Sequence, residues 1–326
     1  MSAPATGAYE WKDLDWRAIE RRVFKLQTRI YKASCRGDVK TVHKLQRLLI
    51  GSWSAKCLAT RRVTQDNRGK KTAGVDGVKS LSPTNRMRLV LLLTLTAKAK
   101  PTRRVWIPKP GSTDRRPLGI PVMRDRATQA LVKLALEPEW EATFEPNSYG
   151  FRPGRSCHDA IAAIFNSICF KPKYVLDADI AKCFERIDHR ALLDKLRTFS
   201  TLRRAIKGWL KAGVMDGLDL TPTTEGTPQG GVISPLLANI ALHGLEAHIA
   251  DCFPRSIQVN GKQITGWRPQ TIRYADDLVV LHHDVAVIEQ CREIVANWLH
   301  RYGLELKPSK TRITHTLHEH EGNVGF

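Results

Sequence analysis

The chain has 326 residues, 42% of them hydrophobic and 26% charged, which is an ordinary composition for a globular protein with a substantial core. No apolar run reaches the ~18 residues of a membrane span, and the seven scattered cysteines form no C-x-x-C pair, which argues against a zinc cluster or a disulfide framework. The formal net charge is +20, and residues 1–130 hold 29 Lys and Arg against 9 Asp and Glu, so they carry all of the excess. Such a localised positive field favours a polyanion, above all nucleic acid, with an acidic membrane surface as the weaker alternative.

Residues 15–57 carry apolar residues at helical spacing, with basic residues on most of the other faces. This pattern predicts two or three amphipathic helices with cationic outer surfaces. A basic, glycine-rich connection follows over 61–80, and a further helix is expected over 83–98.

Two short strands are predicted next, over 103–108 and 115–121, joined by the turn 109–114. Five cationic side chains lie in this hairpin: Arg103, Arg104, Lys109, Arg115 and Arg116. Guanidinium and ammonium groups are the usual protein ligands of phosphate, so the hairpin is suited to gripping phosphate groups.

The middle of the chain alternates helical and extended patterns. A helix, a second helix, a strand and two further helices are expected over 125–141, 157–169, 174–180, 189–197 and 201–211. Ser156 and Asp159 form a capping-box pattern at the start of the second helix.

Glycines in the sequence GTPQGG at 226–231 allow the backbone to approach a ligand closely. Ser234 and Pro235 then begin a helix that is expected to run to residue 250. Two hairpins, a helix and two closing strands complete the chain, over 257–265, 271–281, 285–302, 304–306 and 311–315. Strands backed by helices in this order predict an antiparallel α+β layer with a ferredoxin-like arrangement.

The hairpin over 271–281 places two adjacent carboxylates, Asp276 and Asp277, at its tip. Two like charges side by side are costly unless a cation lies between them, so this tip predicts a Mg²⁺ site, with a solvated turn as the alternative. The strand over 174–180 carries a second pair of acids, Asp177 and Asp179. Three carboxylates that converge from two strand ends can hold two Mg²⁺ ions about 4 Å apart, the arrangement used in nucleotidyl transfer.

Several stretches then occur in a characteristic order: IPK at 107–109, RPLGIP at 116–121, YGFRPGRS at 149–156, DIAKCF at 179–184, TPQGGVISPLL at 227–237, YADD at 274–277 and LKPSKT at 306–311. With these stretches the chain resembles the reverse transcriptases, or maturases, encoded by bacterial group II introns. The resemblance runs from about residue 60 to residue 326.

The resemblance implies a metal-binding triad of Asp179, Asp276 and Asp277, with two Mg²⁺ ions as cofactor and the backbone carbonyl of Ile180 as a further ligand. Asp179 is preferred to Asp177 because it precedes Phe184 by five residues, which is the spacing of the family.

Further residues are assigned by the same resemblance. The incoming dNTP would be contacted by Lys109, Arg116, Arg115, Phe184, Gln229 and Lys310. Phe184 resembles the steric gate that meets the sugar 2′ position, with a plain core position as its alternative, whereas the alternative for Lys310 is a surface lysine. RNA binding is assigned from the localised positive charge and not from the resemblance, to Arg21, Arg22, Lys25, Arg29, Arg61, Arg62, Arg68, Lys70 and Lys71.

The implied fold is an α+β right-hand polymerase with fingers and palm, the palm sheet being ferredoxin-like. Its expected parts are a basic helical extension over 1–80, fingers over 81–172 and a palm over 173–326, the last two partly interleaved. Family members continue into a thumb, a DNA-binding region and sometimes an endonuclease. GNVGF at 322–326 is similar to the opening of the next palm segment, so a truncated palm without a thumb is expected.

The implied function is that of an RNA-directed DNA polymerase of a group II intron that also binds the intron RNA as a maturase, assisting splicing and mobility by target-primed reverse transcription. The partners would be the intron RNA, an RNA template with a DNA primer, a DNA target site and dNTPs, in a bacterial cytoplasmic ribonucleoprotein without a membrane; a homodimer is left open. One alternative is an RNA-binding splicing cofactor with an unused polymerase site. The other is a retron, diversity-generating or defence-type reverse transcriptase.

Overall fold

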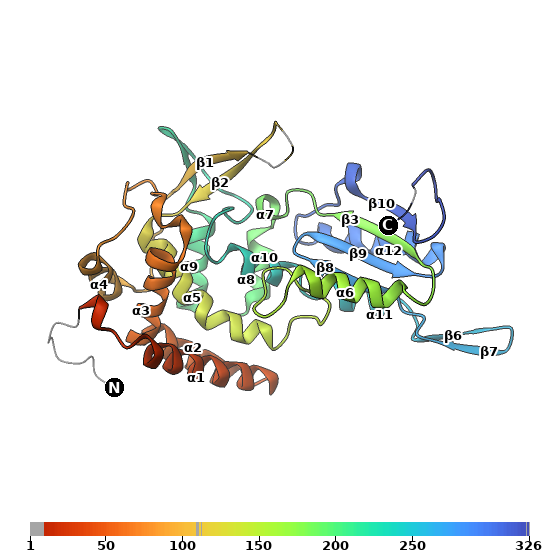
Figure 1. Cartoon of the computed structure of the whole chain (residues 1–326), viewed down its shortest axis with the longest axis horizontal. Helices are drawn as coiled ribbons and strands as arrows, with labels where there is room; N and C mark the ends of the chain where they lie inside the picture. The colour runs from red at the N-terminus through yellow and green to blue at the C-terminus, as the bar shows by residue number, and fades with distance from the viewer. Residues whose placement is uncertain (1–9, 109–110, 112, 324, 326) are drawn as a thin grey trace. The chain divides into compact units, whose positions relative to one another are not determined.

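The computed structural model describes residues 10–108, 111, 113–323 and 325 (Figure 1). The chain divides into two compact units, each built from two separate segments of the sequence. Unit 1 comprises 1–143 and 193–236, and unit 2 comprises 144–192 and 237–326. Across the described ranges, no helix is long and apolar enough to cross a membrane. The division into extension, fingers and palm stays a prediction.

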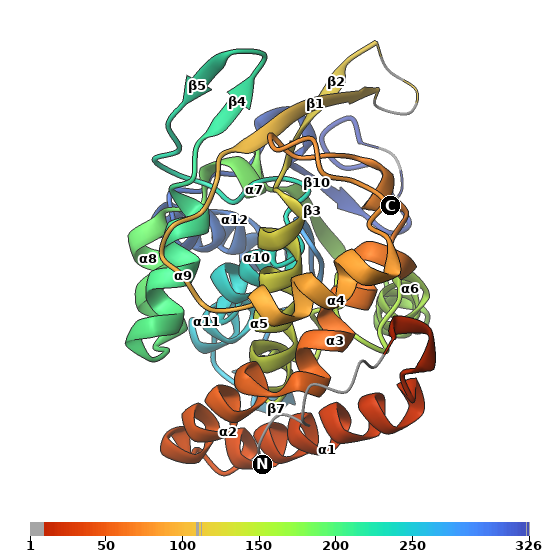
Figure 2. The ribbon, with the colours of Figure 1, turned by 90° about the vertical axis from the view of Figure 1, so that its left-hand side faces the viewer.

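The helical part of unit 1 is built around α5 (Met123–Glu141), whose leucines at 131, 134 and 136 are fully buried. Helices α1 (Trp16–Cys35), α2 (Val39–Gly51) and α3 (Trp53–Arg61) all pack against α5 (Figure 2). The apolar stripes of α1 and α2 supply the contact and their basic residues lie mainly outside, so two of the predicted amphipathic helices are confirmed. Helix α3 is instead buried along most of its length. These helices are therefore part of the core of unit 1.

Shorter helical elements complete the helical part of unit 1. Helix α4 (Pro83–Leu92) ends six residues before the expected end at 98. The others are α9 (Ser200–Leu210), the 3-10 turns η1 (Trp11–Asp13) and η3 (Arg68–Lys71), and the π-helical turn η2 (Arg62–Asp66).

A four-stranded sheet in unit 1 has the order β2-β1-β4-β5. Strand β1 (Thr102–Pro108) pairs antiparallel with β2 (Arg115–Ile120), as the sequence predicted. On its other side β1 pairs in parallel with β4 (Val214–Asp216), which pairs with β5 (Asp219–Thr221). These two strands were not predicted, because three residues are too few to display an alternating pattern.

Unit 2 contains an antiparallel sheet in the order β10-β3-β9-β8. Its strands are β3 (Tyr174–Asp179), β8 (Gln270–Tyr274), β9 (Asp277–His282) and β10 (Arg312–His315).

The two faces of this sheet have different coverings. On one face Leu176, Leu278 and Val280 are fully buried, and α12 (Val285–His300) packs on β3 and β9. On the other face α6 (Cys157–Ile168) covers one end. Because side chains alternate along a strand, the acids of β3 and β9 lie on this second, half-covered face.

Two expected elements differ from the structure. The helix predicted from 234 to 250 is interrupted, giving α10 (Ser234–Leu242) and α11 (Leu245–Asp251), because Gly244 adopts a left-handed φ of 92°. Residues 304–306 form no strand, and Leu306 makes only an isolated bridge with Ile180.

The remaining elements of the chain are short. The capping box of α6 and the hairpin of β6 (Ser256–Val259) and β7 (Lys262–Thr265) match the prediction. The others are α7 (Cys183–Arg186), α8 (His189–Leu196) and the 3-10 turn η4 (Pro308–Lys310).

Candidate active site

The three predicted acids come from two adjacent strands of unit 2. Asp179, the last residue of β3, is the register partner of Asp277, the first residue of β9. Directly opposed residues in an antiparallel pair have Cβ atoms about 4.5–5.5 Å apart, so these two carboxylates share one end of one face. Asp276 lies in the two-residue turn between β8 and β9, and its carbonyl oxygen accepts a hydrogen bond from the Ile180 amide at 3.3 Å. The structure thus brings the triad together.

Burial raises the pKa of the Asp277 carboxyl above its usual value. The negative charges of Asp276 and Asp179 add to this shift, while Lys310 opposes it. The Lys310 ammonium lies 2.8 Å from Oδ2 of Asp179, and this hydrogen bond raises the pKa of the lysine. The site therefore holds an excess of negative charge that a single exposed lysine partly offsets.

This donor set has the chemistry of a hard-cation site, because Mg²⁺ prefers carboxylate and carbonyl oxygens. Among the described residues, no three His, Cys, Asp or Glu side chains are arranged as a group that could hold a metal ion. One carboxylate oxygen of Asp179 forms an ion pair with Lys310 in this arrangement. The donor type and the like charge of the three acids suit Mg²⁺, whereas their side chains are not placed here as a group ready to hold the ion.

The turn that carries Asp276 is tightly confined. Ala275 adopts a positive φ of 58°, which is uncommon for a residue with a Cβ. A Cβ placed on Gly150 would lie 2.4 Å from the Ala275 nitrogen, so only glycine permits this approach. The segment that contains Gly150 also pairs with β8, since the Tyr149 amide donates to the Arg273 carbonyl at 2.9 Å.

A buried arginine lies beside the same turn. Arg273 is 3% exposed, and its guanidinium donates to the Ala275 carbonyl, the Asn239 side chain and the Ser148 hydroxyl at 2.9, 3.1 and 2.7 Å. Burial lowers the pKa of Arg273 to about 10, with the charge of Glu145 acting in the opposite direction. The side chain therefore stays charged at neutral pH.

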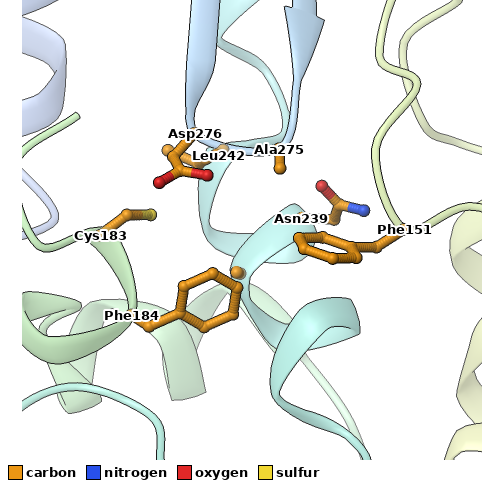
Figure 3. Close-up of a pocket in the computed structure, with 8 residues that line it drawn as sticks. Phe151, Cys183, Phe184, Asn239, Leu242, Ala275 and Asp276 are labelled. Atoms are coloured by element: carbon orange, nitrogen blue, oxygen red, sulfur yellow. The ribbon is translucent and has the colours of Figure 1, made fainter. Parts of the chain in front are cut away.

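A small pocket opens next to the acids, lined by Phe151, Cys183, Phe184, Ala238, Asn239, Leu242, Ala275 and Asp276 (Figure 3). The rings of Phe184 and Phe151 meet edge to face with centroids 6.0 Å apart. Burial raises the pKa of the Cys183 thiol to about 12, so this thiol is neutral. Phe184 thus lines the same pocket as Asp276.

The remaining predicted nucleotide contacts belong to unit 1. Arg115 and Arg116 are exposed on β2, and Lys109 lies outside the described residues. The Gln229 carbonyl accepts a hydrogen bond from the Gly119 amide at 2.6 Å, which joins the 226–231 loop to the cationic hairpin. Within unit 1 the hairpin and the glycine loop are therefore neighbours.

The predicted RNA-binding residues have two kinds of surroundings. Two of them make contacts within the protein: Arg61 pairs with Glu20 and Asp66, and the Lys70 ammonium donates to the Gln65 carbonyl. The others are exposed, namely Arg21, Arg22, Lys25, Arg29, Arg62, Arg68 and Lys71.

Sequence reasoning did not assign a role to Phe151, Asn239, Gly150 or Arg273 at this site. One signal was available for Arg273, because a charge stands in an apolar strand at a position whose alternation points to the core face. For the others, only the tertiary contacts reveal the neighbourhood.

Residues 107–324 match the family of reverse transcriptases (RNA-dependent DNA polymerases), and residues 11–93 match the N-terminal domain of reverse transcriptase. The chain belongs to the reverse transcriptase family, a class of nucleotidyltransferases.

Its relatives include proteins of group II introns, which confirms the resemblance found in the sequence. The chain is 37% identical over 190 residues to the group II intron-encoded protein LtrA of Lactococcus lactis subsp. cremoris, covering 56% of this chain and 31% of LtrA. It is 33% identical over 309 residues to protein YkfC of Escherichia coli K12, covering 83% of this chain and 80% of YkfC. A solved structure of apo telomerase from Candida tropicalis aligns with a TM-score of 0.48 and 12% identity, covering 68% of this chain and 51% of that one.

Proposed function

We propose that the chain acts as the RNA-directed DNA polymerase of a group II intron, and that it binds the intron RNA as a maturase in splicing and target-primed mobility. The observation that carries the proposal is the convergence of Asp179, Asp276 and Asp277 at one end of one sheet, in a member of the reverse transcriptase family. The partners would be intron RNA, an RNA template with a DNA primer, a DNA target and dNTPs, in a bacterial cytoplasmic ribonucleoprotein.

The sheet of unit 2 is the proposed palm. Its strand order β10-β3-β9-β8 supports a ferredoxin-like arrangement, in which the two central strands carry the catalytic groups. The cationic hairpin β1–β2 is the proposed fingers element.

In the proposed reaction the primer 3′-oxygen attacks the α-phosphorus of a dNTP, and the bond to pyrophosphate breaks. Asp179, Asp276 and Asp277 would hold two Mg²⁺ ions, with the Ile180 carbonyl as a further ligand. Bound Mg²⁺ supplies a lowered pKa for the attacking hydroxyl and neutralises charge on the leaving group.

Other residues would place the nucleotide for this reaction. Arg115, Arg116 and Lys109 would contact the triphosphate, and Gln229 would lie beneath the nucleotide. Lys310 would steady Asp179, with which it already forms an ion pair.

The direct test of this function is primer extension with purified protein, an RNA template, a DNA primer and dNTPs in Mg²⁺. Template-dependent addition of nucleotides is expected, and omission of Mg²⁺ should abolish it. RNA binding without any extension would instead support an RNA-binding splicing cofactor.

Substitution of Phe184 with alanine is expected to relax selection against ribonucleotides. Phe184 lines the pocket beside Asp276, and removing its ring would make room for a 2′-hydroxyl. The ratio of kcat/KM for dCTP over CTP should fall at least about 10-fold. Phe165→Ala is the control, because Phe165 is 63% exposed on α6. Unchanged selectivity in Phe184→Ala would assign Phe184 to the core.

RNA binding is best tested by point substitutions, because α1, α2 and α3 cover the buried leucines of α5 and cannot be deleted without exposing them. The triple variant Arg21→Gln, Lys25→Gln, Arg29→Gln removes three exposed charges of α1. If all three contact phosphates, the slope of log affinity against log salt should decrease in magnitude by about 2 to 3.

The control for this variant is a second triple substitution with glutamine, at exposed basic residues of unit 2, namely Lys171, Arg255 and Arg301. Filter binding of intron RNA over a salt series measures both variants. Equal slopes for the α1 variant and the wild type would contradict the assignment of RNA binding to α1.

A further inference from the structure

Arg273 occupies a position where the strand pattern calls for an apolar residue. Ile272 and Tyr274 belong to the acid-bearing face of the sheet, and Arg273 belongs to the opposite face, which packs on the core. An isolated buried charge costs several kcal/mol unless it is paired and fully hydrogen-bonded. A buried arginine at this position therefore needs hydrogen-bond acceptors for the N–H groups of its charged guanidinium.

The partners come from three separate segments of unit 2. One nitrogen, Nη1, donates to the Asn239 Oδ1 of α10 and to the Ala275 carbonyl of the turn, and Nη2 donates to the hydroxyl of Ser148. The Ala275 carbonyl belongs to the peptide group that leads directly into Asp276. The guanidinium thus restrains the orientation of that peptide from the core side.

The same hydrogen-bond network holds the opposite side of the turn. Asn239 accepts from Arg273 and donates through Nδ2 to the Gly150 carbonyl at 2.7 Å. Gly150 in turn lies against the Ala275 nitrogen. The backbone of Arg273 adds one more hydrogen bond to this network, because its amide donates to the Asn147 carbonyl at 2.8 Å.

The turn needs such restraint for two reasons. Ala275 is held at a positive φ, an unfavourable conformation that persists only where the surroundings enforce it. The repulsion among Asp179, Asp276 and Asp277 also favours any movement that separates the carboxylates.

We propose that Arg273 is a positioning residue for the metal site: it fixes the peptide between Ala275 and Asp276 and thereby sets the carboxylates of Asp276 and Asp277 in the geometry that binds the catalytic metal ions. This inference rests on the proposed polymerase function. Arg273 touches neither substrate nor metal in this role, and acts through the Ala275 carbonyl and through Asn239.

The test measures binding of Mn²⁺, as a spectroscopic substitute for Mg²⁺, to the full chain by the EPR signal of the free ion. Arg273→Lys keeps the charge but loses the forked geometry. Its Mn²⁺ affinity is expected to fall about 10-fold or more, as for other residues that orient metal ligands.

The matched control is Arg126→Lys. Arg126 is 6% exposed in unit 1 and donates to the carbonyls of Pro121, Gly69 and Thr72, away from the acid-bearing hairpin. This variant should lose thermal stability, as Arg273→Lys does, but keep the Mn²⁺ affinity of the wild type. An equal loss of Mn²⁺ affinity in Arg126→Lys would overturn the inference, because the effect would then follow from destabilisation alone.

Two further variants keep the test decisive. Asp276→Asn shows how much of the measured Mn²⁺ binding occurs at the acid site. If this variant binds Mn²⁺ as tightly as the wild type does, the proposal of a metal site at these acids is wrong. If Asp276→Asn loses binding and Arg273→Lys retains it, only the inference about Arg273 is overturned. Should Arg273→Lys not fold, Asn239→Ala replaces it, since it removes one guanidinium acceptor and the link to Gly150. A decrease of about 10-fold supports the inference, and unchanged affinity overturns it.

Discussion

Replacement of Asp276 with asparagine is expected to reduce dNTP incorporation on an RNA template by more than about 1000-fold, which corresponds to roughly 4 kcal/mol of transition-state stabilisation. Asparagine has nearly the same shape as aspartate but lacks the negative charge, so the change removes a metal ligand without opening a cavity. Single-nucleotide primer extension under saturating dNTP measures the effect. The affinity for RNA should not change, since the exposed basic residues of α1 are untouched.

The control for this variant is Asp177→Asn, a second aspartate of β3 on the same face. Asp177 pairs with Arg312 at 3.1 Å, and its register partner on β9 is Val279, whereas the partner of Asp179 is Asp277. Loss of a partly exposed ion pair costs at most about 1 kcal/mol, so Asp177→Asn should retain most of the activity. Comparable synthesis by Asp276→Asn and the wild type would refute the metal assignment, whereas loss of synthesis in Asp177→Asn would move the ligand to Asp177.

Elements with strong local signals could be predicted from the sequence. The helix after Ser156 has a capping box and the hairpin about Asn260 has an Asn-Gly turn, so both were placed within a few residues. The regular apolar stripe of α1 predicted a helix without fixing where it ends. Strands β4 and β5 were not predicted because each has only three residues and because β4 pairs with β1, which lies more than 100 positions away. Helix α10 ends at Leu242 because Gly244 adopts a left-handed conformation. The sequence did not reveal this break, because a single glycine is also tolerated inside longer helices.

The same distinction applies to the site. Asp276 and Asp277 were selected because adjacent acids interrupt an apolar strand. Asp177 and Asp179 both end another strand, and Asp179 was preferred because of the spacing that the family resemblance implies. The residues behind the turn gave weaker signals. Asn239 lies within an apolar helix and Gly150 within a loop, and their relation to Ala275 arises only from the packing of α10, the loop and β8. Residues singled out by their chemical type could therefore be selected from the sequence, whereas neighbours that depend on a close approach could not.

Gly150→Ala is expected to lower kcat of nucleotide addition about 100-fold through displacement of the catalytic turn. The new Cβ would lie 2.4 Å from the Ala275 nitrogen and 2.9 Å from its Cβ, so backbone must move on one side of the contact. Displacement of reacting groups by about 1 Å is enough for a loss of this size. Overpacking should also reduce the free energy of unfolding by about 1–3 kcal/mol. Steady-state kinetics and thermal unfolding of the same preparation measure both effects.

Gly208→Ala separates the two effects. Its Cβ would lie 2.3 Å from the Ala97 carbonyl oxygen, an equally tight contact, but Gly208 belongs to α9 in unit 1 and Gly150 belongs to unit 2. We expect a similar loss of stability with kcat retained in the folded protein. Gly154→Ala, in the same loop as Gly150 and with open space around its Cβ, should show only the small cost of a positive φ. If Gly150→Ala and Gly208→Ala lose stability equally and both keep kcat, the loop at Gly150 supports the fold without setting the turn. A selective loss of kcat in Gly150→Ala would establish that the position of Ala275 against this glycine governs catalysis.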